Sequence, residues 1–440
     1  MHPATRRWSL RFSALAILSL AACSAPAEES TENAADDLSL SNLVKLARGT
    51  IDRTVVDPAN PWAQKKLAIG EENRLPNEAA EFATFAKLVN RIQANSQAEL
   101  KAKAPFRAFH AKPHACVRGT ATIDNRALPA SARVGLFATN ASYPTWARFS
   151  GGVSTPQPDK KLDIHGLALK FVGVPGARIL TQPGDDTATT QDFLFTDQSV
   201  APASDARHMM AFAEASLGVA DNNSILGKFE NLAAVGAFLT RDENVRIVDF
   251  LVNRALPKTR STGSLLGDTF YSGAPMALGL EAGDVNTAKA KGAFKLIAKT
   301  GVLRNGVCTA MPASPNTKDD AFLHNDLVKR FGAETVCIDL SIQIQQDPNR
   351  EVLEDVSVEW RNAAISVGRI TFESRKLGEV AADAEQATCD AFSFFPWHTI
   401  ADHRPLGNAM RARRVAMPSS AGYRDATTPE PTAPAPTGGR

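Results

Sequence analysis

Short β-like runs bounded by Gly, Pro or Asp recur along this chain, and they constrain its fold more than any other feature. A first block, between residues 110 and 197, contains CVRGTATI, ARVGLFAT, TWARFS, LALKFVGV and QDFLFTD. A second block, from residue 292 onward, contains GAFKLIA, CIDLSIQIQ, SVEW and GRITF. Short strands separated by turn residues are typical of antiparallel sheets and barrels.

Helical patterns precede and separate the two strand blocks. Residues 77–104 carry apolar side chains at helical spacing and are rich in Ala, Glu, Lys and Gln. The run DARHMMAFAEASLG and residues 225–255 also have helical patterns. Strands in two blocks with helices inserted between them predict one α+β domain on an antiparallel barrel or sheet, which we expect over residues 41–425.

The N-terminus has the pattern of an export signal. Three arginines precede the apolar run ALAILSLAAC, which is too short to span a membrane. Residues 20–23, Leu-Ala-Ala-Cys, resemble a bacterial lipobox, so residues 1–22 are expected to be a lipoprotein signal peptide and Cys23 the acylated N-terminus. Ordinary signal cleavage beside an incidental cysteine is the alternative, and Arg6-Arg7 leaves Sec and twin-arginine export both open. Ser24, in place of an aspartate, indicates the periplasmic face of the outer membrane.

The mature chain has little net charge and two polar ends. Removing residues 1–22 takes away three of the 49 basic residues and none of the 47 acidic residues. This balance excludes the basic surface of a nucleic-acid-binding protein. Residues 23–40 are expected to be a polar tether, and residues 426–440 a disordered Pro- and Thr-rich tail. No second long apolar segment follows, so the lipid alone would hold the protein at the membrane.

Four cysteines remain after the lipobox: Cys116, Cys308, Cys337 and Cys389. Export permits disulfides, and four cysteines allow three pairings, among which the sequence does not choose. The absence of a C-x-x-C motif argues against zinc.

His110 and His114 form an H-x-x-x-H pair, which on a helix could bind a metal ion. Pro113 argues against a helix here, and position 111 is alanine where zincins carry glutamate. No G-x-S-x-G motif supports a serine hydrolase. The remaining possibility is that one histidine and Arg148 face the same pocket. Peroxide chemistry on haem uses such a pair, because the imidazole moves a proton and the cation favours charge separation across the O–O bond.

Several motifs resemble those of haem catalases. FHAKPHACVRGTATI resembles the catalase opening HAKGAGAFG, WARFSGG…DIHGLALKF resembles RFS…D-x-RGFALKF, and QDFLFTD resembles NTPxFFIRD. LEDVSVEW, RITF and SFFPWHTIADHRPLGNAMRARR are similar to the catalase-related family, a divergent bacterial branch of the haem catalase superfamily. The match runs in order over residues 75–425. It implies a catalase-like antiparallel β-barrel with an N-terminal helix and inserted and C-terminal helices.

The resemblance implies a distal pocket. It places His110 as the catalytic histidine and Arg148 as a catalytic cation that also faces the haem propionates. The alternative for Arg148 is a structural ion pair with Asp163. His114 is expected to be a second-shell or surface group. Residues 189–191, Thr-Thr-Gln, stand where catalases carry the distal asparagine.

The proximal side departs from the catalase pattern. Catalases use a tyrosinate helped by an arginine, and the resemblance puts His398 at or beside the tyrosine and Phe394 at the arginine. His398 is therefore the candidate ligand of the haem iron, a role that histidine fills in peroxidases. Tyr271 and Tyr423 are the other candidates. Alternatively, His398 begins a helix after Pro396, His403 pairs with Asp402, and the fold has lost haem.

These features together predict a haem-dependent peroxidase with at most weak catalase activity. Its substrates would be hydrogen peroxide or an organic peroxide and a reductant that the sequence does not identify. One alternative is a non-catalytic barrel used as an envelope binding scaffold, and another is a haem enzyme that transforms lipid hydroperoxides. The oligomeric state does not follow from the sequence.

Overall fold

The computed structural model describes residues 51–99, 107–179, 186–220, 241, 244–374, 377, 386–389, 391–424 and 426. The predicted signal peptide, Cys23, the tether and nearly all of the tail lie outside these residues. Within them, no helix combines the length and the apolar character needed to cross a membrane.

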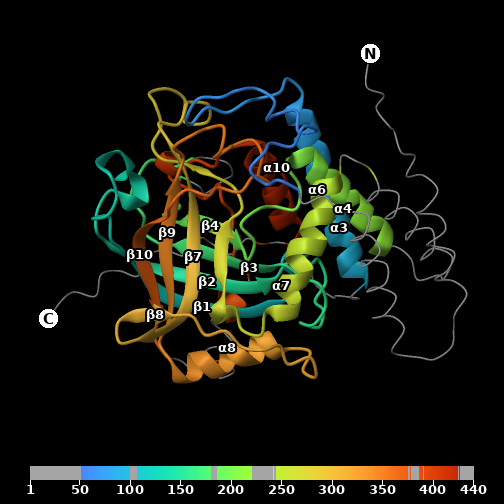
Figure 1. Cartoon of the computed structure of the whole chain (residues 1–440), viewed down its shortest axis with the longest axis vertical. Coiled ribbons are helices and arrows are strands. Elements are labelled where there is room, and N and C mark those ends of the chain that lie inside the picture. Colours follow the sequence, from blue (N-terminus) through green and yellow to red (C-terminus); the bar gives the residue numbers. More distant parts are fainter. Residues whose placement is uncertain are drawn as a thin grey trace, which may run out of the picture.

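Eight antiparallel strands form a closed barrel (Figure 1). The order around the barrel is β5-β4-β3-β2-β1-β10-β9-β7, and β5 pairs with β7 to close it. The strands are β1 (Pro113–Ile123), β2 (Ser142–Gly151), β3 (His165–Phe171), β4 (Gln191–Thr196), β5 (Thr269–Ser272), β7 (Ala293–Arg304), β9 (Val336–Ile344) and β10 (Ile365–Phe372). Two short strands, β6 (Met276–Ala277) and β8 (Val307–Thr309), also pair with β7. The predicted α+β barrel is therefore confirmed.

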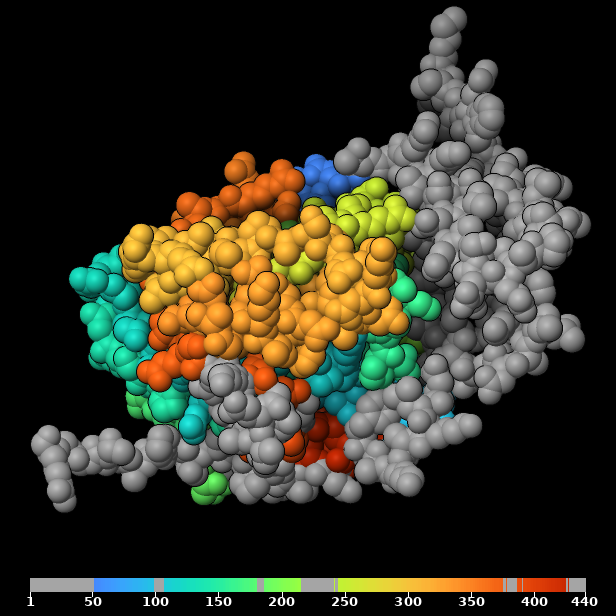
Figure 2. Space-filling model, turned by 90° about the horizontal axis from the view of Figure 1, so that it is seen from below, coloured from blue at the N-terminus to red at the C-terminus, as the bar shows by residue number. Residues whose placement is uncertain are grey.

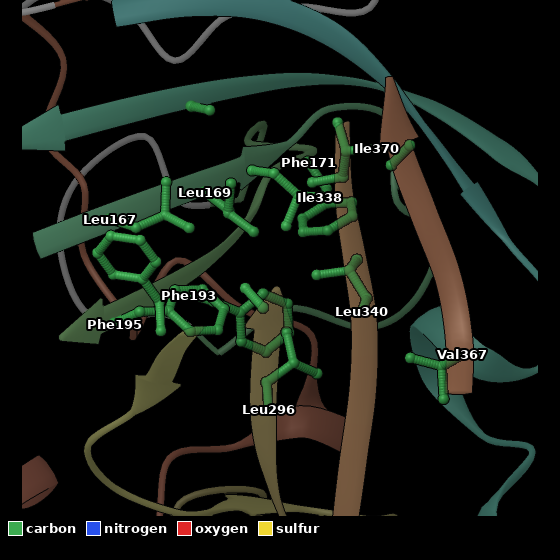
Figure 3. Packing of buried hydrophobic residues seen from close by; sticks show 14 of the residues in the cluster. Leu167, Leu169, Phe171, Phe193, Phe195, Leu296, Ile338, Leu340, Val367 and Ile370 are labelled. Carbon is green, nitrogen blue, oxygen red and sulfur yellow. The ribbon is translucent and has the colours of Figure 1, made fainter. Parts of the chain in front are cut away.

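The barrel is filled by side chains from alternate strand positions. In β3 and β4 the inward residues are apolar and buried: Leu167, Leu169, Phe171, Phe193 and Phe195. Figure 3 shows them facing Leu296, Ile338, Leu340 and Ile370 from the other side of the barrel. Because strand side chains alternate with a period of two, Gly166, Ala168 and Lys170 of β3 must lie on the outer face.

Two of the predicted strands do not form. Residues 132–139 fall in a segment with the 3₁₀ turns η2 (Ala130–Ala132) and η3 (Gly135–Phe137), where Gly135 has a φ of 54° that interrupts an extended chain. Residues 357–360 form a turn, because the Asp355 carboxylate accepts hydrogen bonds from the backbone and hydroxyl of Ser357. In both places local turn chemistry overrides the apolar pattern.

Helices cover one side and one end of the barrel. On the side, α3 (Glu78–Glu99) packs against α4 (Ala206–Ala220) and α10 (Asn408–Tyr423). The segment α6 (Val245–Phe250), a π-helical turn (Leu251–Ala255) and α7 (Leu256–Ser261) runs beside them. At the end, α8 (Phe322–Ala333) buries Phe322, Leu323, Leu327 and Phe331. Seen from this end, the segment around α8 covers the barrel (Figure 2).

Two disulfides resolve the pairing that the sequence left open. Cys116 of β1 pairs with Cys389, and Cys308 of β8 pairs with Cys337 of β9. The first joins the outer face of the barrel to the segment that leads to His398. The second joins the β8 extension to the barrel wall.

Candidate functional site

His110 lies just before β1, on the outer side of the barrel, in a backbone conformation that non-glycine residues rarely adopt. Its φ is 55°, in the left-handed region. Two hydrogen bonds hold it there: its N–H donates to the Gly152 carbonyl at 3.4 Å, and its carbonyl accepts from Arg148 Nη1 at 3.0 Å. Strained backbone of this kind is maintained only where surrounding contacts over-determine it, as is common at functional sites.

The imidazole ring of His110 is oriented by two neighbouring strands. Its Nδ1 lies 3.2 Å from Ser150 Oγ on β2, a residue 40 positions away in the chain. Its ring occupies the space above Gly166 of β3, where a Cβ atom would come within 2.3 Å of Nδ1. Ser150 therefore fixes the rotation of the ring, and the missing side chain at Gly166 makes room for it.

Positive charge surrounds this ring. The pKa of His110 is lowered to about 3, mainly by burial and then, in decreasing order, by the charges of Arg148, Arg107 and Arg413. The imidazole is thus neutral at physiological pH. The three arginines come from distant segments: Arg107 precedes β1, Arg148 lies on β2 and Arg413 on α10. This cluster favours an anionic ligand beside His110.

The outer face next to His110 is apolar. Ala168 of β3 and Leu194 of β4 are register partners and are partly exposed, although their neighbours along each strand are buried. Trp146, Phe392 and Phe394 pack beside them together with the Cys116–Cys389 disulfide. A partly exposed apolar floor bordered by aromatic rings suits a flat, largely apolar ligand.

His398 lies at the other end of the same strand pair. The register of β3 and β4 puts Gly166 opposite Thr196 and Lys170 opposite Asp192, about 13 Å apart along the strands. His398 Nδ1 is 3.3 Å from Asp192 Oδ2, and the His398 carbonyl accepts from the Asp192 N–H at 2.9 Å. Asp192 also accepts from Lys170 Nζ at 2.8 Å, with both side chains fully buried. His398 is 3% exposed and has the carboxylate partner that metal-ligating histidines commonly have.

The structure brings His110 and Arg148 together beside Gly166 at one end of the β3–β4 pair, whereas His398 lies beside Asp192 at the other end. Asp163 holds the backbone beside them: its carboxylate accepts from the N–H groups of Gly152 (2.8 Å) and Ile164 (2.7 Å). His403 interacts with Asp402 through its charge and a backbone hydrogen bond, and two further hydrogen bonds position its ring. It accepts from the Leu136 N–H at 2.9 Å and bonds the Ala277 carbonyl at 3.2 Å.

His114 is fully buried, so the expectation of a surface position is wrong. Its ring lies 6.2 Å from the His165 ring. Pro113 begins β1, and the two histidines therefore share no helix face, as the sequence predicted.

Tyr271 and Tyr423 are the alternative proximal residues, and among residues 189–191 only Gln191 carries an amide. That amide is buried, and its Oε1 accepts from Thr399 Oγ1 at 2.9 Å and from the Ile400 N–H at 3.1 Å. Burial raises the pKa of Tyr271, and the nearby charge of Glu359 adds to this, which disfavours a tyrosinate. Tyr423 is 39% exposed at the end of α10. Thr189 is exposed and accepts a hydrogen bond from the Val174 N–H through its carbonyl.

Sequence reasoning missed four residues of this site: Arg107, Ser150, Gly166 and Arg413. Ser150 and Gly166 stand inside the two motifs that resemble catalases, but their role depends on strand pairing. Arg107, three positions before His110, had the clearest local signal. Arg413 had none, because α10 comes near His110 only through tertiary packing.

Comparisons with solved structures define the class of fold. The structure is similar to a bacterial catalase (TM-score 0.53, 15% identity, covering 89% of this chain and 71% of that one). It is also similar to catalase A from Saccharomyces cerevisiae (0.52, 15%, 84% and 70%) and to a fungal catalase (0.51, 16%, 84% and 68%). No protein-family model and no curated protein matches the sequence. The chain therefore has the catalase fold, and at this identity the likeness establishes the fold alone.

Proposed function

We propose that this protein is a haem-dependent peroxidase of the bacterial envelope, from a divergent catalase-related branch. The observation that carries the proposal is the neutral imidazole of His110, bonded to Ser150 and bordered by three arginines and an apolar floor. Bound haem would supply the redox-active iron at which the peroxide O–O bond breaks. The residues present suit this group, since the arginines could pair with its two carboxylates and the apolar and aromatic side chains beside His110 could contact its ring.

His110 would act as the acid–base group. When Nδ1 donates to Ser150 Oγ, Nε2 carries a lone pair that can accept a proton from one peroxide oxygen and return it to the other. Burial and then the arginines keep the imidazole neutral, and the carboxylates of a bound ligand would offset the arginine charge and raise the pKa of His110. Arg148 would add electrostatic stabilisation of the separating charge.

His398 would hold the haem iron, with Asp192 increasing the electron density on its ring. The exposed position of Thr189 and the raised pKa of Tyr271 favour peroxidase turnover over catalase turnover, because threonine begins the segment that resembles the distal asparagine motif and burial disfavours a tyrosinate at Tyr271.

The location is a proposal from the sequence. The lipobox-like segment ending at Cys23 supports a lipid-anchored protein on the periplasmic face of the outer membrane. The two disulfides are compatible with an oxidising compartment.

The visible spectrum of protein expressed with ample haem tests the proposal. A Soret band with histidine-type ligation, together with peroxide-dependent oxidation of an artificial reductant, is the expected result. Protein that folds but never takes up haem would instead support the non-catalytic scaffold. Conversion of a lipid hydroperoxide without a reductant would support the rearranging enzyme.

A further inference from the structure

Three buried metal-ligating side chains meet at the end of the barrel that α8 covers. His165 is the first residue of β3, Asp197 follows β4 directly, and Asp268 precedes β5 directly. Their nearest ligand atoms all lie within 4.8 Å of one another. The residues are 2%, 5% and 7% exposed, so water contributes little to their solvation.

Each carboxylate uses one oxygen and leaves the other without a partner. Asp197 Oδ2 lies 2.9 Å from His165 Nδ1, and Asp268 Oδ1 pairs with Lys258 Nζ. Asp197 Oδ1 and Asp268 Oδ2 are buried and have no hydrogen-bond partner in the part of the chain that the structure describes. Leaving a buried carboxylate oxygen unsatisfied is costly, so a partner for both is expected.

We propose that His165, Asp197 and Asp268 bind a divalent first-row transition-metal ion. One imidazole and two carboxylates form a nitrogen–oxygen donor set that suits zinc, manganese or iron(II). Metal–ligand bonds of about 2.1 Å put the ligands of one ion roughly 3–4 Å apart, so small side-chain movements would complete the site.

Backbone hydrogen bonds hold these side chains in place. The Asp197 N–H donates to the His165 carbonyl at 3.0 Å, which fixes two ligands against each other. The Asp268 carbonyl accepts from both the N–H (3.1 Å) and the hydroxyl (2.9 Å) of Thr300. Because the ligands sit at the ends of three different strands, a bound ion would tie these ends together.

The ion would also fix the position of His110. His165 immediately precedes Gly166, and the His110 ring lies over Gly166. Because successive residues of a strand point to opposite faces, the His165 side chain and the His110 ring lie on opposite faces of β3. The metal site is therefore separate from the His110 side of β3, and a bound ion would fix the strand end on which Gly166 lies. Its role is positioning, and it does not require haem to be bound.

Metal binding by the untagged mature chain, freed of metal with a chelator, tests this proposal. Titration with zinc chloride or manganese chloride, followed by calorimetry and by metal analysis after gel filtration, should give one ion per chain. The bound ion should raise the melting temperature by about 3 °C at saturating metal. Haem content is measured separately, so that the metal-site proposal and the proposed peroxidase function are tested independently.

Asp197→Asn and Asp268→Asn each remove one ligand charge while keeping an oxygen for the existing hydrogen bond. Either variant should weaken binding more than about 100-fold, because loss of an outer-shell partner alone costs about 10–100-fold. If one variant does not fold, the other decides. Asp205→Asn is the matched control, since Asp205 is a buried aspartate 2.9 Å from His208 in α4. It should bind metal like the wild type. Absence of stoichiometric binding, or equal binding by all variants, would overturn the proposal.

Discussion

The His110 ring lies directly over Gly166, and a single methyl group at Gly166 would come within 2.3 Å of His110 Nδ1. His110 itself is held at a φ of 55° by Arg148 and Gly152. The contacts of the His110 backbone with Arg148 and Gly152, at the end of β2, and the absence of a side chain at Gly166 of β3 together determine where the imidazole lies.

Gly166→Ala should displace the His110 ring and lower peroxidase kcat/KM by about tenfold or more, since a small displacement of a catalytic group strongly lowers the reaction rate. The barrel should remain folded, because the added methyl group lies on the outer face. Steady-state kinetics and circular dichroism measure the two effects. Gly273→Ala is the control, since no atom lies within 4 Å of a Cβ there. Wild-type rates in Gly166→Ala would show that the ring position does not matter for turnover.

His110→Ala should keep haem and fold while peroxide-dependent turnover falls by about two to four orders of magnitude, the range for a positioned acid–base group. Ser150→Ala should cause a smaller loss, because it removes only the partner that orients Nδ1. His114→Asn should lower turnover least, because the His114 ring lies beside His165 and not beside His110. Stopped-flow mixing with peroxide compares the three. Similar rates in all of them would rule out a catalase-type distal pocket.

His398→Ala should lose bound haem, because it removes the side chain that would hold the haem iron. Asp192→Asn should retain haem but alter its spectrum, although the loss of a buried partner for Lys170 will also lower stability. Absorbance at the Soret band, relative to protein concentration, measures retention. Full haem content with an unchanged spectrum in His398→Ala would show that His398 is not the iron ligand, and Tyr271 and Tyr423 would then be the candidates.

The contribution of His403 to stability should decrease as the pH falls from 6.5 to about 4. Burial lowers the pKa of His403 from 6.5 to about 4, although the Ala277 carbonyl and Asp402 oppose this effect. The unfolded chain therefore binds more protons in this window, which costs the folded state on the order of 3 kcal/mol by pH 4. His110 acts in the same direction, with a window that extends to about pH 3.

Urea unfolding at several pH values measures this dependence. His403→Gln can preserve both hydrogen bonds without titrating, so its free energy of unfolding should depend less on pH than that of the wild type. An equal pH dependence in both proteins would contradict the assignment to His403.

Cys23→Ala should release the protein from the membrane fraction or leave uncleaved precursor. Ser24→Asp should redirect it to the inner membrane, if the usual sorting rule applies. Fractionation followed by immunoblotting measures both. Unchanged membrane attachment in Cys23→Ala would show that Cys23 is not the anchor.

The sequence by itself determined the barrel strands with period-two patterns and pointed to His110 and Arg148. These features are local. The alternation of apolar and polar residues sets which side of a strand faces the core, and a short motif identifies Arg148 within its strand. It also rejected a helical metal site at His110 and His114, because Pro113 acts within its own segment.

Only the tertiary structure decided the contacts between distant segments. Gly166 makes room for His110, Arg413 adds its charge from α10, and Cys116 selects Cys389 among three possible partners. The two predictions of strands at residues 132–139 and 357–360 were wrong for a related reason. A left-handed Gly135 in the first segment, and a hydrogen bond from Ser357 to Asp355 in the second, replaced strand pairing. Local composition sets the propensity of each segment, whereas pairing and packing set which segments meet.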